Sequence, residues 1–329
     1  MPDLNVIDIA PLWSTNRSHW DEVDRAIGAA IEQQGAFVVG GYHHAEQVDN
    51  WARTLLRFYD LSEADRRAVA SVITDPSGPA VYRGWKSFLQ PEAWAYNQMF
   101  DIGPREPHPA PAVVGMHHFA EANSLPAVEP CEGWFAAVDA FYDLMLDVGT
   151  RVMLAAGRWA GFDDRLLADG FREGNSTLRL LDYPTKPGGL SIDSENAGVP
   201  GRPPLAASKH TDVAGASLLW QREPGLQAQS ADRVWHDVPM LPNTVSVHLG
   251  TVLQLMTDGR VPATPHRVLD HGQHRQSVAF FVEPGLGTRL APLGANDVPD
   301  PTGPGTYGWH LQERFSQMDG YRTIIPAPA

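Results

Sequence analysis

Two histidines and an aspartate in the second half of the chain have the types and spacing of metal ligands. His210 and Asp212 are two residues apart in SKHTDVAGASLLW, a segment whose composition predicts a strand. Side chains at positions i and i+2 of a strand project from the same face, so one imidazole and one carboxylate should point to a common spot. A third ligand is available at His266, in the short segment TPHRVL. Two imidazoles and one carboxylate on one side of an octahedral ion leave about three positions open, which suits a non-haem Fe(II) centre that reacts with O2.

Arg275 and Ser277, which follow His266 in RQSVAFFVEP, could bind a carboxylate. Strand alternation places both side chains on one face. An arginine on the inner face of a β core is costly to bury unless an anion meets it, and its planar fork suits bidentate binding of a carboxylate. A metal ion beside this guanidinium would hold a molecule with a chelating end and a distal carboxylate, which describes 2-oxoglutarate.

Each of these residues also has a plainer explanation. His210 and Asp212 could be a local salt bridge on a surface strand, and His266 could be a histidine satisfied within the core. Arg275 and Ser277 could form a structural ion pair and a strand hydroxyl. The order and spacing of all five residues together favour the metal and carboxylate site.

Composition favours a small organic molecule as the partner. Of the 329 residues, 43% are hydrophobic and 19% are charged, an ordinary balance for a globular protein. The formal net charge of -14 gives no basic stripe with which to bind nucleic acid. Because the overall field opposes an anionic partner, a few placed cations such as Arg275 would have to capture one locally.

The sequence also predicts the compartment. The single cysteine, Cys131, excludes an intrachain disulfide and a Cys-rich zinc site. The N-terminal residues lack the basic and apolar regions of a targeting segment, and no window reaches the roughly 18 apolar residues of a membrane span. We therefore expect a cytoplasmic protein that does not bind membranes. The sequence predicts no particular oligomeric state.

Residues 1–175 have a mostly helical pattern. Apolar residues recur at helical spacing after Ser18, which is the expected cap of a first helix that ends near Gln34. Further helices are predicted over 45–60 and 133–160, and short strands over 6–12 and 36–39.

From Ser176 the pattern changes to short strands. Segments rich in Val, Leu and aromatic residues, such as TLRLLDY, TVSVHL and SVAFFVEP, are separated by Gly, Pro and Asn. This pattern is typical of an antiparallel sandwich or jelly roll. We expect a single α+β domain over 1–329 with a mainly β core: a mostly helical region (1–175), a jelly roll with the metal site (176–284), and a C-terminal loop and short helix (285–329).

Two segments are rich in Pro, Gly and Ser and are predicted to be loops. The first, Thr185 to Pro204, directly precedes the candidate metal strand and is interpreted as a possible lid. The second, Gly285 to Gly308, precedes a helix expected over 309–318.

The motifs together resemble the isopenicillin N synthase-like family of iron and 2-oxoglutarate oxygenases. The segments that carry the resemblance are HTD at 210–212, PHRV at 265–268, RQS at 275–277 and LRLLDYP at 178–184. PGLQAQ, WHDVPMLPNT and the N-terminal VIDIAPL also fit, so the likeness covers most of the chain. His-x-Asp alone is a weak signal, but with a spaced His and Arg-x-Ser in order it is specific.

The resemblance implies a double-stranded β-helix, or jelly roll, with the N-terminal helices packed outside it. It also implies an oxidation in which 2-oxoglutarate and O2 give succinate and CO2, with hydroxylation of the substrate as the usual outcome and desaturation or ring closure as variants. Tyr183 corresponds to a tyrosine that often contacts a carboxylate. Arg83, Phe100 and Phe281 are predicted to line the substrate pocket. The family alone suggests a role in secondary metabolism.

The chain departs from the family in one motif. In VHLGTVLQLMTDG, His248 and Thr251 stand where an Asn-x-Gly-Asp pattern is common. This leaves the metal ligands intact, but it changes the hydrogen bonds expected near the co-substrate.

Three functions fit these residues. The first is an Fe(II)- and 2-oxoglutarate-dependent oxygenase of a small molecule. The second is an oxidase of the isopenicillin N synthase type, which uses no 2-oxoglutarate and would grip its substrate's own carboxylate with Arg275 and Ser277. The third is a catalytically silent jelly-roll binding protein, which has no need of open metal positions.

Overall fold

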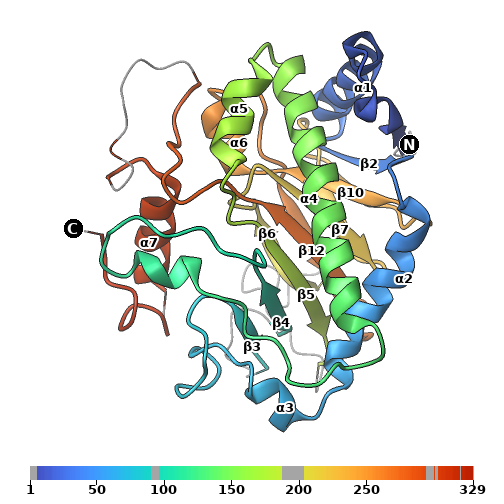
Figure 1. Ribbon diagram of the computed structural model, residues 1–329. Helices are drawn as coiled ribbons and strands as arrows, with labels where there is room; N and C mark the ends of the chain where they lie inside the picture. Colours follow the sequence, from blue (N-terminus) through green and yellow to red (C-terminus); the bar gives the residue numbers. More distant parts are fainter. Residues whose placement is uncertain are drawn as a thin grey trace.

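Two facing β-sheets form the centre of the protein. The computed structural model describes residues 6–89, 96–186, 204–293, 300, 303–318 and 320–328 (Figure 1). Within these residues the larger sheet has the order β1-β2-β10-β7-β12-β5-β4-β3 and the smaller the order β6-β11-β8-β9. The strands are β1 (Val6–Asp8), β2 (Ala36–Gly40), β3 (Gly84–Ser87), β4 (Gln98–Ile102), β5 (Thr177–Tyr183), β6 (Leu205–His210), β7 (Ala216–Gln221), β8 (Leu226–Gln229), β9 (Trp235–Asp237), β10 (Val245–Leu249), β11 (His266–Leu269) and β12 (Arg275–Val282).

Side-chain alternation divides the large sheet into two faces. On β7 and β12, Leu219 and Ala279 point inward and pack against the small sheet, where they meet Ala228 and Val268. The residues between them, such as Leu218, join the main core on the other face. One face therefore lines the space between the sheets, and the other is covered by helices.

The longest helix, α4 (Trp134–Trp159), lies across the outer face of the large sheet (Figure 1). Its buried Phe141, Met145, Val148 and Val152 recur every three or four residues, which gives one apolar stripe to pack on the sheet. The other helices are α1 (Trp20–Gln33), α2 (Ala45–Leu56), α3 (Glu63–Arg67), α5 (Asp164–Phe171), α6 (Thr251–Met256) and α7 (Tyr307–Ser316), with 3-10 turns η1 (Ala10–Trp13), η2 (Arg17–His19), η3 (Arg57–Asp60) and η4 (Met116–Ala120). No helix in the described parts of the chain is long and apolar enough to cross a lipid bilayer.

The predicted jelly roll and most of the predicted elements are present, with three corrections. Strand β1 ends at Asp8, because Pro11 lies in the 3-10 turn η1. Ser18 does not cap the first helix: α1 begins at Trp20 without a side-chain cap, and Asn16 caps the preceding turn η2 by accepting a hydrogen bond from the Ser18 amide. The region expected to be mostly helical also supplies β1 to β4, which pair into the large sheet. Most of the predicted loop 185–204 lies outside the described residues.

Gly149 sets how closely α4 approaches the sheet. A Cβ atom at this position would lie 2.5 Å from Val282 Cγ2 and 2.6 Å from Leu218 Cδ1. Both neighbours belong to the buried core and have no room to move away.

Gly149→Val should therefore destabilise the fold by overpacking this contact. We expect the free energy of unfolding to fall by about 1–3 kcal/mol. Urea unfolding followed by circular dichroism measures the change. Ala136→Val, at an exposed position of the same helix, is the control and should cost no more than about 0.7 kcal/mol of helix propensity. Equal losses in the two variants would contradict the close approach at Gly149.

Candidate metal and carboxylate site

The structure brings His210, Asp212 and His266 together. One ligand atom from each lies within 4.8 Å of the others. The side chains of His210 and His266 meet because β6 and β11 pair with these two residues directly opposite one another. Asp212 follows in the turn after β6, with its carboxylate oxygens 3.8 Å from His210 Nε2 and 3.6 Å from His266 Nε2. Strand pairing and a turn, rather than alternation within one strand, therefore assemble the three ligands.

Hydrogen bonds orient all three side chains. Nδ1 of His210 lies 2.7 Å from the Ser208 carbonyl, and Nδ1 of His266 lies 3.1 Å from the Thr264 carbonyl. With Nδ1–H donating to these oxygens, each Nε2 lone pair is left to face the point between the ligands. The Ser217 hydroxyl donates to Asp212 Oδ2 at 2.6 Å.

Burial and mutual charge favour the protonation state that a metal requires. Burial lowers the pKa of His210, and the neighbouring His266 lowers it further. Burial alone would raise the pKa of Asp212, but the two histidines and the Ser217 hydrogen bond outweigh it, so the pKa lies below its usual value. Neutral imidazoles beside an ionised carboxylate are the ligand forms that bind a divalent ion.

Arg275 is a buried cation on the inner face of β12. Arg275 is only 5% exposed. Its guanidinium donates to Ser277 Oγ at 3.1 Å and to Gln221 Oε1 at 3.3 Å. Its Cζ lies 5.3 Å from the centre of the Tyr183 ring. Among the described residues Nε has no hydrogen-bond partner, and no carboxylate lies within 4 Å of the guanidinium. A cavity of about 330 Å³ reaches both Arg275 and Tyr183.

Gln221 and Ser217 are polar partners that sequence reasoning missed. Both lie on β7 and point inward, opposite Ser277 and Phe281 of β12. Their alternation with apolar residues in ASLLWQ was visible, but their partners depend on strand register, which the sequence does not display.

His248 and Thr251, which depart from the family motif, both lie at this site. The His248 ring is 4.9 Å from that of His266, and its Nδ1 is buried without a partner among the described residues. Thr251 supports the turn that carries Asp212, because its amide and hydroxyl both donate to the Asp212 carbonyl.

The three predicted pocket residues lie in different surroundings. Phe281 is on the inner face, half-buried, on the same side of β12 as Ser277. Phe100 points to the opposite, helix-covered face, where it stacks on Phe58 with ring centres 4.0 Å apart. The prediction that Phe100 lines the pocket is therefore wrong, because the alternation of β4 turns it outward.

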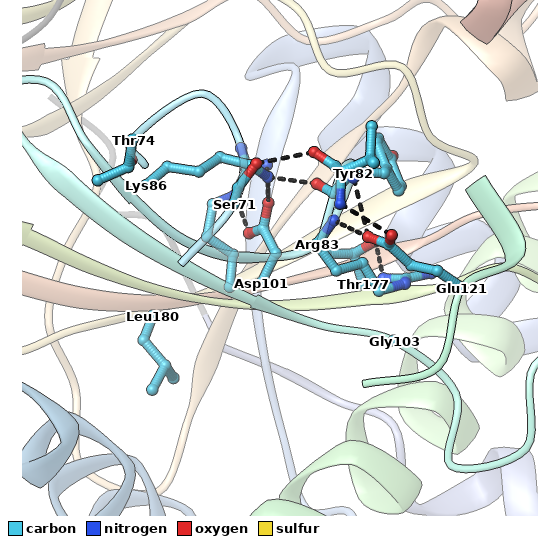
Figure 2. Close-up of polar contacts among 12 residues, drawn as sticks. Ser71, Thr74, Tyr82, Arg83, Lys86, Asp101, Gly103, Glu121, Thr177 and Leu180 are labelled. Atoms are coloured by element: carbon cyan, nitrogen blue, oxygen red, sulfur yellow. Dashed lines mark hydrogen bonds and ion pairs between the residues drawn. The ribbon is translucent and has the colours of Figure 1, made fainter. Parts of the chain in front are cut away.

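Arg83 is fully buried and already bonded within the fold. Its guanidinium donates to Thr177 Oγ1 and to the backbone and side-chain oxygens of Asn175. Figure 2 shows Arg83 beside Thr177, with the Glu121 carboxylate accepting bonds from the backbone amides of Tyr82 and Arg83. These contacts give Arg83 a structural role, and its contact with a substrate stays a prediction.

Thr177 also links Arg83 to a buried carboxyl group, Glu283. Thr177 Oγ1 donates to Glu283 Oε2 at 2.6 Å, and the Tyr307 hydroxyl donates to Oε1. Burial raises the pKa of Glu283 to about 7, because these hydrogen bonds and the nearby arginines lower it only in part.

Glu283 should make the stability of the protein depend on pH. A carboxyl group whose pKa is higher in the folded chain than in the unfolded chain destabilises the fold increasingly as pH rises from its ordinary pKa near 4.5 to about 7. Between about pH 5 and about pH 7.5, the wild type should lose about 2 kcal/mol of unfolding free energy relative to Glu283→Gln. Urea unfolding at the two pH values measures the difference, and a constant difference would contradict the raised pKa.

Comparisons with known proteins agree with this fold and site. Residues 175–284 match the sequence model of the 2OG-Fe(II) oxygenase superfamily. Isopenicillin N synthase from Streptomyces clavuligerus is 27% identical over 312 residues, which cover 89% of this chain and 88% of the relative. The 2-oxoglutarate-dependent dioxygenase citB from Monascus ruber is 28% identical over 201 residues, which cover 59% of this chain and 58% of the relative.

A solved structure shows the same fold. The dioxygenase for auxin oxidation 1 from Arabidopsis thaliana, in its binary complex with 2-oxoglutarate, superposes with a TM-score of 0.63 at 18% identity, over 90% of this chain and 98% of that one. The fold is that of the jelly-roll oxygenases, and the segment that matches the 2OG-Fe(II) oxygenase superfamily, residues 175–284, contains His210, Asp212, His266, Arg275 and Ser277. The predicted enzyme class, a non-haem iron dioxygenase, and the predicted cofactors, Fe(II) and 2-oxoglutarate, are confirmed at the level of this superfamily.

Proposed function

We propose that this enzyme binds Fe(II) through His210, Asp212 and His266 and holds the distal carboxylate of 2-oxoglutarate with Arg275 and Ser277. It would then hydroxylate, desaturate or cyclise a small molecule while releasing succinate and CO2. The observation that carries the proposal is Arg275, a buried guanidinium without a carboxylate partner among the described residues, inside the same jelly roll as the three ligands.

The three ligands fit iron better than zinc or magnesium. Two imidazoles and one carboxylate form the donor set of non-haem Fe(II) sites with open positions, whereas Mg²⁺ prefers oxygen ligands and most structural zinc sites use four protein ligands. A zinc hydrolase would also need a nearby general base. In the described part of the chain, the group of close donors comprises only His210, Asp212 and His266.

The surroundings of Arg275 fit a carboxylate. Its unpartnered Nε, the Ser277 hydroxyl and the Tyr183 ring all belong to the inner faces of β12 and β5. A carboxylate bound there would neutralise the buried charge and accept charge-assisted hydrogen bonds. The bond from Arg275 to Gln221 fixes the direction of the guanidinium fork.

The residues of the chain position the reactants and keep water away from them. Iron and 2-oxoglutarate, when bound, would supply the activation of O2 and the oxidising equivalents. The carbonyls of Ser208 and Thr264 fix the histidine rings, and Ser217 fixes Asp212. Apolar side chains of both sheets, including Leu219, line the space between the sheets.

We also propose that residues 1–329 form a single oxygenase domain. Strands β2 and β4, from the N-terminal region, pair directly with β10 and β5 of the jelly roll. A boundary near residue 175 would cut through one continuous sheet, which supports a single unit.

The purified enzyme should convert 2-oxoglutarate to succinate only when Fe(II) is present. His210→Ala should abolish this activity and the thermal stabilisation by added Mn²⁺, because two ligands hold the ion weakly. Mass spectrometry measures succinate, and differential scanning calorimetry measures Tm. His117→Ala, at an exposed histidine outside the site, should keep both properties. Succinate formation that survives in His210→Ala would contradict the ligand assignment.

Arg275→Gln should weaken the binding of 2-oxoglutarate by about ten- to hundredfold, because a charge-assisted hydrogen bond contributes about 1.5–3 kcal/mol. Anaerobic titration of the Fe(II) protein with 2-oxoglutarate, followed by the visible charge-transfer band, measures the dissociation constant. Fe(II) binding should not change. An unaltered dissociation constant would show that the carboxylate binds elsewhere.

A second candidate is an oxidase of the isopenicillin N synthase type. The observation that favours it is coverage: relatives of that name match along 88% to 97% of their length, whereas citB matches along 58%. In this case Arg275 and Ser277 would hold the substrate's own carboxylate, and substrate oxidation would proceed without 2-oxoglutarate.

A catalytically silent binding protein, in contrast, would bind metal but give no charge-transfer band with 2-oxoglutarate and form no succinate.

A further inference from the structure

Arg179 lies on the inner face of β5, beside the candidate metal site. It pairs with Ala279 of β12, and its Cζ lies 5.2 Å from the centre of the Phe281 ring. Phe281 in turn lies opposite Ser217, the residue that bonds Asp212. Since neighbouring strands are about 4.8 Å apart, the backbone of Arg179 is roughly 10 Å from β7.

A buried carboxylate holds Arg179 in place. Asp101 of β4, directly opposite in the sheet, accepts bonds from Arg179 Nε at 2.6 Å and Nη2 at 2.8 Å. Lys86 of β3 donates to the same carboxylate at 2.6 Å and to the Tyr82 carbonyl, as Figure 2 shows. Two nitrogens of the Arg179 fork are therefore fixed, and the third, Nη1, points away from Asp101.

This cluster, Lys86, Asp101 and Arg179, carries one positive charge in excess. Two cations share one carboxylate, and the carboxylate is ionised because both cations hold its pKa well below the usual range despite its burial. The nearby Arg83 and Glu283 are bridged by Thr177 and offset each other in part. An excess charge inside a protein is costly unless an anion joins it.

The excess charge is accessible. The side chains of Lys86 and Asp101 are 5% and 4% exposed, whereas that of Arg179 is 30% exposed. In the described residues Nη1 of Arg179 has no hydrogen-bond partner. A guanidinium whose only role was to neutralise Asp101 could be as buried as Lys86. The guanidinium of Arg179 is instead partly exposed, and its free donors lie on the side of the sheet that faces the metal ligands.

We propose that Arg179 binds an anionic group of the prime substrate, so that the enzyme acts on small organic acids. The cluster would fix the acid end of the molecule and leave its carbon skeleton to reach the metal past Phe281. This inference rests on the proposed function, and it gives the jelly roll two separate carboxylate anchors: Arg275 for the co-substrate and Arg179 for the substrate. The local cation Arg179 would also offset the net charge of -14, which repels an anionic substrate.

The test compares carboxylates with their neutral amides. Protein loaded with Mn²⁺ and saturated with 2-oxoglutarate, so that Arg275 is occupied and no turnover occurs, is titrated by calorimetry. The probes are straight-chain and aryl-substituted carboxylates, including hexanoate and phenylacetate, each with the amide of the same skeleton. The wild type should bind the best acid about ten- to hundredfold more tightly than its amide, as a charge-assisted hydrogen bond implies.

Arg179→Gln should remove this preference while the dissociation constant for 2-oxoglutarate stays within about twofold of the wild type. Arg179→Lys, which keeps the charge but loses the fork, should retain part of the preference. Arg105→Gln removes a charge from an exposed arginine paired with Asp139 and should change nothing. Circular dichroism and Tm identify any variant that fails to fold. If Arg179→Gln does not fold, the acid-over-amide preference of Arg179→Lys, compared with that of the wild type, tests the assignment.

Two results would overturn the assignment of Arg179. One is that no acid binds the wild type better than its amide, and the other is that Arg179→Gln keeps the preference. Neither result affects the proposed function, which fails in this experiment if 2-oxoglutarate itself does not bind the wild type with Mn²⁺.

Discussion

The buried charge of Arg275 is the constraint on which the rest of the site depends. Burial lowers the pKa of this guanidinium, yet an arginine stays protonated in a protein, so the cost of burying it must be met by a partner. The hydrogen-bond partners that the described chain offers are neutral, Ser277 and Gln221, with the face of Tyr183 beside them. The Glu223 carboxylate raises the pKa of Arg275 from nearby, but it forms its ion pair with Arg222. The protein therefore holds a cation whose natural complement is a carboxylate supplied by a ligand.

The jelly roll makes this arrangement possible by bringing two sheets together over a narrow interior. The small sheet supplies His210 and His266 through the pairing of β6 with β11, and the large sheet supplies Arg275 through β12. Helix α4 covers the outer face so closely that residue 149 must be glycine. The outer face thus carries the stability of the fold, which leaves the inner face free for polar residues that serve chemistry.

The sequence predicted the parts of this arrangement that depend on local patterns. The candidate metal ligands, the Arg-x-Ser pair and the long helix all show in motifs or in apolar spacing. What it did not predict depends on register and on sheet order: Phe100 and Asp101 are adjacent, but only the pairing of β4 with β5 shows that Asp101 faces inward and meets Arg179. In the same way, His210 and Asp212 have the spacing of neighbours on one strand face, but the strand ends at His210 and a turn positions the carboxylate. Strands β3 and β4 were also missed, because their buried polar residues Lys86, Gln98 and Asp101 interrupt the apolar pattern that identifies a strand.

The central claim is that one interior holds iron at the three ligands and a carboxylate at Arg275. A crystal structure determined anaerobically with Fe(II) and 2-oxoglutarate tests it most directly, with anomalous scattering at the iron edge to locate the metal. The account predicts iron bound by His210 Nε2, His266 Nε2 and an Asp212 oxygen, and the distal carboxylate of 2-oxoglutarate hydrogen-bonded to Arg275 and Ser277. Iron at any other set of residues, or 2-oxoglutarate bound away from Arg275, would contradict it.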